Sequence, residues 1–159
     1  MSLDIGQTAP EFSLPATSNQ QITLNELRGN NIVLYFYPKD NTPGCTTEGQ
    51  NFGHHHQNFS DNNCLIFGIS RDTLNSHEKF KCSQSLPFEL ISDTDETLCR
   101  LFDVIKQKNM YGKQVEGIER STFLIDINGV IQQIWRKVKV EGHVDEVLSA
   151  VKALNLTQI

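Results

Sequence analysis

The sequence has no closely spaced pair of cysteines. The nearest two of its four cysteines, Cys82 and Cys99, are 17 positions apart, and the others are Cys45 and Cys64. Zinc sites and thioredoxin-type dithiols usually show a C-x-x-C pair, so this spacing disfavours both. We therefore expect no bound metal, and we interpret each cysteine either as core packing or as a single reactive thiol.

The chain also lacks a long apolar run and a cluster of basic residues. No segment approaches the roughly 20 consecutive apolar residues that cross a bilayer, and the opening MSLDIGQTAPEF shows no signal-peptide pattern. The net charge of −5 disfavours nucleic acid and membranes as partners. We expect a cytoplasmic protein whose cysteines stay reduced and whose partners are small molecules or other proteins.

Strand and helix patterns alternate along the chain. Continuous apolar runs at 31–37 and 64–70 predict strands that are buried on both faces. Elsewhere we expect a hairpin and a short helical turn in 1–30, helices at 43–58, 73–85, 95–105 and 142–154, a strand at 88–93, and two strands around an Asn-Gly turn within 121–138. This order predicts an α/β protein with a central mixed sheet flanked by helices, of thioredoxin-like architecture. The 159 residues suffice for one core, so residues 1–159 are predicted to form a single domain.

The segment TPGC at 42–45 stands where the first buried strand gives way to a helix. With Thr42 as the N-cap, Pro43 takes the first helical position and Cys45 the third, where a capping box would place Glu or Gln. The sulfur then lies beside the Thr42 hydroxyl and the free N–H groups of the first turn, where the helix dipole favours an anion. Cysteines at such places reach pKa values of roughly 3.5–7.5.

This position makes Cys45 a candidate nucleophile. The loop follows the carboxyl end of a central strand, which is where open α/β sheets place their ligand sites. Gly44 adds no side chain, so we expect an open approach to the sulfur. The alternative is that Cys45 is a small apolar residue packed in a turn.

The residues around this cysteine resemble those of a known family. Pro38, Thr42 and Cys45 in PKDNTPGCTTE match the P-x-x-x-T-x-x-C signature of peroxiredoxins, and TPGCT is similar to the bacterioferritin comigratory protein, or peroxiredoxin Q, branch. The resemblance runs from GQTAPEFSLP through RSTFLID to the last helix. It implies a thiol-dependent peroxidase that reduces hydrogen peroxide and organic hydroperoxides without metal, haem or flavin.

The resemblance also implies a role for each matching residue. Cys45 would attack the peroxide and become a sulfenic acid, Thr42 would hold the peroxide, and Pro38 would shape the loop and shield the sulfur. Arg120, in GIERSTFLID, would donate to both thiolate and peroxide, although it could also be a surface ion-pair residue. Glu48, three residues after Cys45, would orient this arginine or else lie solvated in the first turn.

The sequence departs from many members of this branch at position 50, where a resolving cysteine is replaced by Gln50. Another subgroup resembles this chain in taking its resolving cysteine from the helix that carries Cys82, which implies a Cys45–Cys82 disulfide. Such a bridge needs the two Cα atoms within about 7 Å, so local unwinding is expected. The alternative is a one-cysteine cycle in which an external thiol attacks the sulfenic acid.

The remaining candidates are interpreted as structural. Cys64 and Cys99 lie in apolar surroundings and are expected to be buried, slow thiols. His54, His55 and His56 are consecutive, so on a helix they point about 100° apart and are expected to be solvated. The phenylalanines recur at core spacings and Trp135 lies on a predicted strand, so these aromatic residues are assigned to packing. They are Phe52, Phe59, Phe80, Phe88 and Phe102.

Two other functions remain open on the same fold. A peroxide sensor or redox-regulated binding protein would react once at Cys45 and stay oxidised, whereas a noncatalytic binding module would not need Cys45 at all. For the enzyme, the resemblance implies thioredoxin, glutaredoxin or glutathione as the reductant. It also implies a monomer.

Overall fold

Seven strands form one mixed sheet in the computed structural model, which describes residues 3–158. The strand order is β2-β1-β5-β4-β3-β8-β9. Strands β3, β4 and β5 are parallel, whereas β8 pairs antiparallel with β3 and the β1–β2 hairpin pairs antiparallel with β5. The bounds are β1 Ser13–Ala16, β2 Gln20–Thr23, β3 Asn31–Phe36, β4 Cys64–Ser70, β5 Glu89–Ser92, β8 Ser121–Ile125 and β9 Ile131–Trp135.

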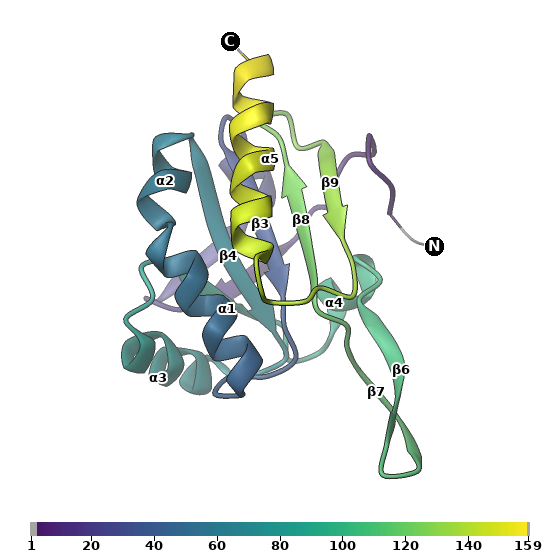
Figure 1. The fold of residues 1–159 in the computed structure, drawn as a ribbon. Coiled ribbons are helices and arrows are strands. Elements are labelled where there is room, and N and C mark those ends of the chain that lie inside the picture. Colours follow the sequence, from purple (N-terminus) through teal and green to yellow (C-terminus); the bar gives the residue numbers. More distant parts are fainter. Residues whose placement is uncertain (1–2, 159) are drawn as a thin grey trace.

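Helices pack on both faces of this sheet (Figure 1). Successive side chains of β3 point to opposite faces, so Val33 and Tyr35 join one apolar cluster while Ile32 and Leu34 join the other. The first cluster is completed by α1, α2, α3 and α5, and the second by α4 and the amino-terminal segment. The bounds are η1 Leu24–Leu27, α1 Pro43–His54, α2 His56–Asp61, α3 Leu74–Gln84, α4 Thr97–Leu101 and α5 His143–Thr157.

The main predicted elements are confirmed, including the amino-terminal hairpin, the short helical turn and the two strands around the Asn-Gly turn. The predicted helix at 43–58 is instead two helices, because α1 ends at His54 and His55 separates it from α2. No helix within residues 3–158 is both long enough and apolar enough to span a bilayer.

The prediction of a helix at 95–105 was wrong in its extent. Only Thr97–Leu101 is helical, since Glu96 before it and Asp103 after it both adopt left-handed backbone angles, with φ of 65° and 53°. The chain then forms a hairpin that the sequence did not predict, β6 Ile105–Met110 and β7 Lys113–Ile118. This hairpin forms its own two-stranded sheet and projects from the body (Figure 1).

The pairing of β3 with β8 brings two distant parts of the sequence together. Phe36 at the end of β3 lies opposite Ser121 at the start of β8, because the two strands run in opposite directions. The loop that leaves β3 toward α1 and the residue that precedes β8 therefore lie at the same edge of the sheet. That residue is Arg120.

Candidate active site

Cys45 lies in the first turn of α1 with its sulfur against Arg120. Thr42 is the N-cap and Pro43 begins the helix, as predicted, so Cys45 stands at the third helical position. Arg120 Nη2 donates to Cys45 Sγ at 3.4 Å. Cys45 is only 1% exposed, so the site presents a thiol that is both next to a cation and removed from bulk solvent.

Glu48 holds the other side of the Arg120 guanidinium. Arg120 Nη1 lies 2.6 Å from Glu48 Oε1, and the Glu48 side chain is completely buried. Burial alone would lower the pKa of Arg120, but the charges of Glu48 and Cys45 outweigh this and raise it, so the guanidinium stays charged. Burial raises the pKa of Glu48 to about 7, and Arg120 only partly opposes the shift. The solvated position considered for Glu48 is therefore excluded.

The loop residues Pro38 and Thr42 lie in the segment between β3 and α1. Pro38 is partly buried. The Thr42 hydroxyl donates to the carbonyl oxygen of Lys39 at 2.8 Å and makes no bond to the free N–H groups of α1. Its oxygen therefore retains acceptor capacity for another donor.

The prediction of an open approach beside Gly44 was wrong for this conformation. A β-carbon placed on Gly44 would lie 3.1 Å from Arg120 Nη2. The space that the missing side chain leaves is thus occupied by the guanidinium. Gly44 allows the arginine to approach the thiol instead of leaving the thiol open to solvent.

Cys82 is the one exposed cysteine, and it lies near the end of α3. It is not bonded to Cys45, which is buried. Gln50, at the position of the missing resolving cysteine, donates to Gln84 Oε1 at 2.8 Å. The middle of α1 therefore contacts the final turn of α3, two residues beyond Cys82.

The other cysteines and the predicted packing aromatics are placed as expected. Cys64 and Cys99 are buried, and burial raises the pKa of each thiol. The five predicted core phenylalanines are all buried, and Trp135 packs edge-on to His143 with ring centroids 5.8 Å apart.

The three consecutive histidines are not all fully solvated. His54 is exposed, whereas His55 and His56 are partly buried. His55 Nε2 also lies 3.3 Å from Asp145 Oδ1 at the start of α5. This pair links the break between α1 and α2 to α5.

A second polar cluster beside the loop was missed by the sequence reasoning. Asp40, Asp72 and His77 bring their polar atoms within 4.8 Å of one another. The shortest contacts are His77 Nδ1 to Asp40 Oδ2 at 2.8 Å and the Asp40 backbone N–H to Asp72 Oδ2 at 2.9 Å. The partners are more than 30 positions apart, so no local pattern could have connected them.

Tyr35 also was not anticipated at the site. Its ring stacks on Phe52 with centroids 4.5 Å apart. Burial raises its pKa well above the ordinary value, and the charges of Glu48 and Cys45 add to this. Within residues 3–158, the buried side-chain oxygens without a hydrogen-bond partner are Tyr35 OH and Glu48 Oε2. The phenol is therefore neutral and adds no charge to the site.

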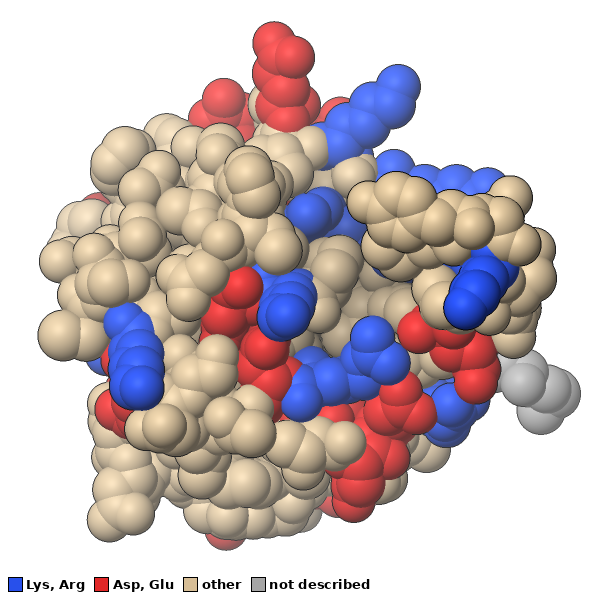
Figure 2. All heavy atoms as spheres, turned by 90° about the horizontal axis from the view of Figure 1, so that it is seen from below, with Lys and Arg blue, Asp and Glu red and all other residues tan. Residues whose placement is uncertain are grey.

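Positive and negative side chains are interspersed on the lower face of the molecule (Figure 2). Two of the basic residues are paired with acidic side chains: Arg71 with Glu96 at 2.8 Å, and Lys106 with Asp103 at 3.1 Å. Arg120 is paired with the buried Glu48 and also contacts the thiol. Each of these three basic residues therefore has an acidic partner close by.

Comparison with known proteins agrees with this geometry. A model of the AhpC/TSA family matches residues 5–134. The chain belongs to this family. It is 54% identical to the Peroxiredoxin Bcp of Xanthomonas campestris over 91% of this chain and 92% of that protein. It is also 46% identical to the Peroxiredoxin Bcp of Bacillus subtilis over 98% and 99% of the two chains. The resemblance to the bacterioferritin comigratory protein branch is confirmed.

Solved structures of peroxiredoxins share the fold. The bacterioferritin comigratory protein of Xanthomonas campestris, studied for alkyl peroxide reduction in trapped intermediate and ligand complexes, superposes with a TM-score of 0.87 at 53% identity over 91% of this chain and 92% of that one. A cysteine-to-serine variant of Xylella fastidiosa PrxQ gives a TM-score of 0.91 at 44% identity over 96% and 98%. The predicted thioredoxin-like fold is confirmed, and the peroxiredoxin is a thiol-dependent peroxidase.

Proposed function

We propose that Cys45 is the peroxidatic residue and that Arg120 activates it. The observation that carries this proposal is the position of one guanidinium between Cys45 Sγ and Glu48 Oε1. A cation at hydrogen-bond distance favours the thiolate, which is the nucleophilic form of cysteine. Glu48 supports the cation from the side opposite the sulfur and so keeps it aimed at the reacting atoms.

The first step transfers one oxygen atom. The Cys45 thiolate attacks the terminal oxygen of the hydroperoxide, the O–O bond breaks, and the sulfur becomes a sulfenic acid. The other oxygen leaves with the bonding electron pair and takes up a proton to become water or an alcohol. Arg120 stabilises the charge that moves onto the leaving oxygen. Thr42 and Pro38 belong to the loop that receives the peroxide.

Cys82 resolves the sulfenic acid by forming a disulfide with Cys45 and releasing water. Support comes from its exposure and from the contact between Gln50 and the final turn of α3. Cys45 is buried in α1 and Cys82 is exposed on α3. The first turn of α1 and the last turn of α3 must therefore unwind locally before the two sulfurs meet. Variants at two different cysteines are known among the structures of Xanthomonas campestris Peroxiredoxin Q.

The proposed substrates and reductants follow from the reaction of the Cys45 thiolate with a hydroperoxide. Hydrogen peroxide and alkyl hydroperoxides are the proposed substrates, and a thioredoxin, a glutaredoxin or glutathione is the proposed reductant of the disulfide. The protein acts as an antioxidant enzyme in the cytoplasm, as a single domain and a monomer. Its free cysteines suit a reducing compartment.

The deciding measurement is the intact mass of the reduced protein after one equivalent of hydrogen peroxide, with and without a sulfenic-acid trap. We expect a loss of two hydrogens and little trapped product, and the disulfide should map to Cys45 and Cys82. In Cys82→Ser the trap should add to Cys45. An internal disulfide that still forms in Cys82→Ser would exclude Cys82 as the resolving residue.

Turnover separates the enzyme from a sensor. With a thioredoxin system present, the wild type should consume many equivalents of peroxide, and Cys45→Ser should consume none. A protein that reacts once and remains oxidised under these conditions would instead support the sensor function.

A further inference from the structure

His77 is buried beneath the loop that carries Pro38 and Thr42, and it is not explained by the reaction as described so far. Its side chain is completely buried in α3, and it contacts Asp40, which lies midway between those two loop residues. A buried titratable pair of this kind is costly unless every polar atom has a partner. The partners therefore indicate what the pair does.

Hydrogen bonds hold both members of the pair. His77 Nε2 lies 3.0 Å from the backbone carbonyl of Ile91, which can only accept, so this nitrogen carries a proton. The Tyr37 hydroxyl donates to Asp40 Oδ1 at 2.7 Å, and Ser76 donates to Oδ2 at 2.8 Å. These donors suit an ionised carboxylate.

The pKa of Asp40 agrees with this assignment. Burial alone would raise the pKa, but the hydrogen bond and charge of His77 outweigh it and leave the pKa below its usual value. His77 Nδ1 lies 2.8 Å from Asp40 Oδ2, so the ring and the carboxyl group share a hydrogen bond. The two residues therefore form a buried, hydrogen-bonded pair.

The Asp40–His77 pair connects the loop to the central sheet and to α3. Through Nε2 the ring is tied to β5 in the central sheet, and through its own backbone it belongs to α3. The Asp40 backbone N–H is held in addition by Asp72 Oδ2 at 2.9 Å, just after β4. Asp40 therefore has almost no freedom to move relative to the sheet.

We propose that His77 is a positioning residue for peroxide reduction, which acts by holding Asp40 and thereby the Pro38–Thr42 loop against the Cys45 thiolate. This inference rests on the proposed roles of Cys45, Pro38 and Thr42. The Thr42 hydroxyl is bonded within the loop to Lys39, whereas the bonds at Asp40 tie the loop to α3 and to the segment after β4. A displacement of the reacting groups by about 1 Å can reduce a rate on the order of 100-fold.

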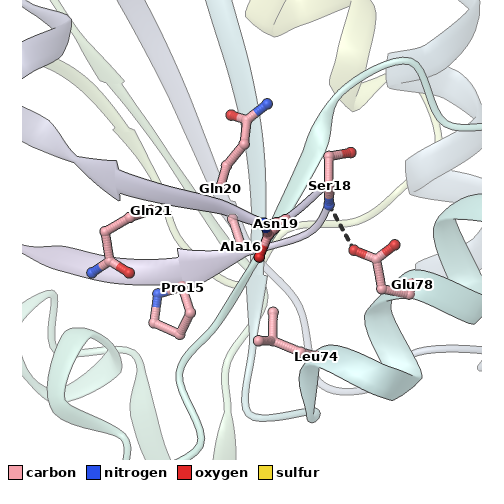
Figure 3. A pocket seen from close by; sticks show the side chains of 8 residues that line it. All are labelled: Pro15, Ala16, Ser18, Asn19, Gln20, Gln21, Leu74 and Glu78. Carbon is pink, nitrogen blue, oxygen red and sulfur yellow. Dashed lines mark hydrogen bonds between the residues drawn. The ribbon is translucent and has the colours of Figure 1, made fainter.

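The two halves of α3 are held by different contacts. The first half is held by His77 and by Glu78 Oε1, which accepts the Ser18 backbone N–H at 2.6 Å across the hollow shown in Figure 3. The last turn, with the exposed Cys82, is held to α1 by the exposed bond between Gln50 and Gln84. Unwinding at the Cys82 end therefore need not break the Asp40–His77 contact.

Two substitutions of His77 separate its two hydrogen bonds. The amide nitrogen of asparagine reaches about as far as Nδ1, so His77→Asn keeps a donor for Asp40. Glutamine reaches about as far as Nε2, so His77→Gln keeps a donor for Ile91 and loses the bond to Asp40. The measured quantity is the rate constant for Cys45 sulfenic acid formation with hydrogen peroxide, followed by rapid quenching and mass spectrometry at a temperature where all variants are folded.

We expect His77→Gln to slow this step by about 10- to 100-fold and His77→Asn to recover most of the loss. The subsequent rate of disulfide formation should not fall in either variant. Val151→Ala, in the core of α5, serves as the stability control, because it lowers the melting temperature without contacting the loop. It should oxidise at the wild-type rate.

The inference is overturned if His77→Gln oxidises as fast as the wild type, or if both histidine variants slow equally. Should His77→Gln not fold, Asp40→Asn decides by the same measurement, because it removes the charge that orients the ring. If the wild type itself forms no sulfenic acid at Cys45, the proposed function fails instead of the role of His77.

Discussion

The guanidinium of Arg120 occupies the place that a side chain on Gly44 would take. A β-carbon at Gly44 would lie 3.1 Å from Arg120 Nη2, the same nitrogen that donates to Cys45 Sγ. The absence of a side chain at one residue thus sets the position of the cation at the thiol.

Gly44→Ala should therefore lower peroxidase activity without unfolding the protein. The added methyl group would push the guanidinium away from the sulfur, and we expect kcat/KM for hydrogen peroxide to fall on the order of 10-fold. Steady-state peroxide consumption with a thioredoxin system measures this. Gly53→Ala lies in the same helix but faces Pro87, so it is the matched control. Equal activity of the two variants would contradict the role assigned to Gly44.

Glu48→Gln should change how stability depends on pH. The pKa of Glu48 is about 7 in the folded protein against 4.5 for the ordinary side chain, so the folded state binds a proton more tightly between these values. Its contribution to the free energy of unfolding is fully present below pH 4.5 and is lost as the pH rises through 7. Relative to Glu48→Gln, the wild type should lose about 1 to 3 kcal/mol across this window.

Urea unfolding at a series of pH values tests the prediction for Glu48. Glu116→Gln, at a half-exposed position on β7, is the control and should follow the wild-type pH dependence. Parallel curves for Glu48→Gln and the wild type would show that the carboxyl has no raised pKa.

His143 should contribute to stability with the opposite pH dependence, and His143→Gln should remove this contribution. Burial lowers the pKa of His143 to about 4 from 6.5, while its Nε2 lies 2.8 Å from the Thr122 hydroxyl. The unfolded chain therefore binds more protons between pH 4 and 6.5, and stability present above 6.5 is lost as the pH falls toward 4. The wild type should lose about 3 kcal/mol at most over this range, and the variant less.

Thermal unfolding from pH 4 to 7 measures this difference, with Val147→Ala as a control that destabilises α5 at every pH. An unchanged slope for His143→Gln would contradict the assignment of a buried neutral imidazole.

Gln50→Ala should speed disulfide formation. The Gln50–Gln84 hydrogen bond joins α1 to the turn that must unwind around Cys82, and it is exposed. Its loss is worth about 0.5–1.5 kcal/mol, so we expect a few-fold faster conversion of sulfenic acid to disulfide. Gln57→Ala removes a comparable exposed bond to Asp61 within α2 and should leave the rate unchanged. A slower reaction in Gln50→Ala would indicate that this contact assists the rearrangement.

The sequence predicted the buried strands and the start of α1 at Thr42 and Pro43 well, because their patterns are local. Residues 31–37 are apolar throughout since β3 is buried on both faces, and the TPGC segment carries its own helix start. The place of Arg120 next to the thiol came from the family resemblance. Its physical cause is the antiparallel register of β8 against β3, which no short segment reveals.

The features that the sequence analysis missed or placed wrongly also have specific physical causes. The β6–β7 hairpin has no alternating apolar pattern because most of its side chains are exposed on both faces. The predicted helix at 95–105 ended early because Asp103 takes a left-handed conformation, which composition does not indicate. The Asp40–His77 pair joins residues 37 positions apart in sequence, so it became visible only in the folded protein.

The projecting β6–β7 hairpin is a structural unit separate from the main sheet. Its two strands start and finish opposite each other, with Ile105 paired to Ile118, and its tip carries Tyr111, which is 99% exposed. A peptide tag or a fluorescent label inserted at the tip would leave the path of the chain into Arg120 unchanged. The arm is thus an attachment point for a reporter that lies outside the main sheet and its core.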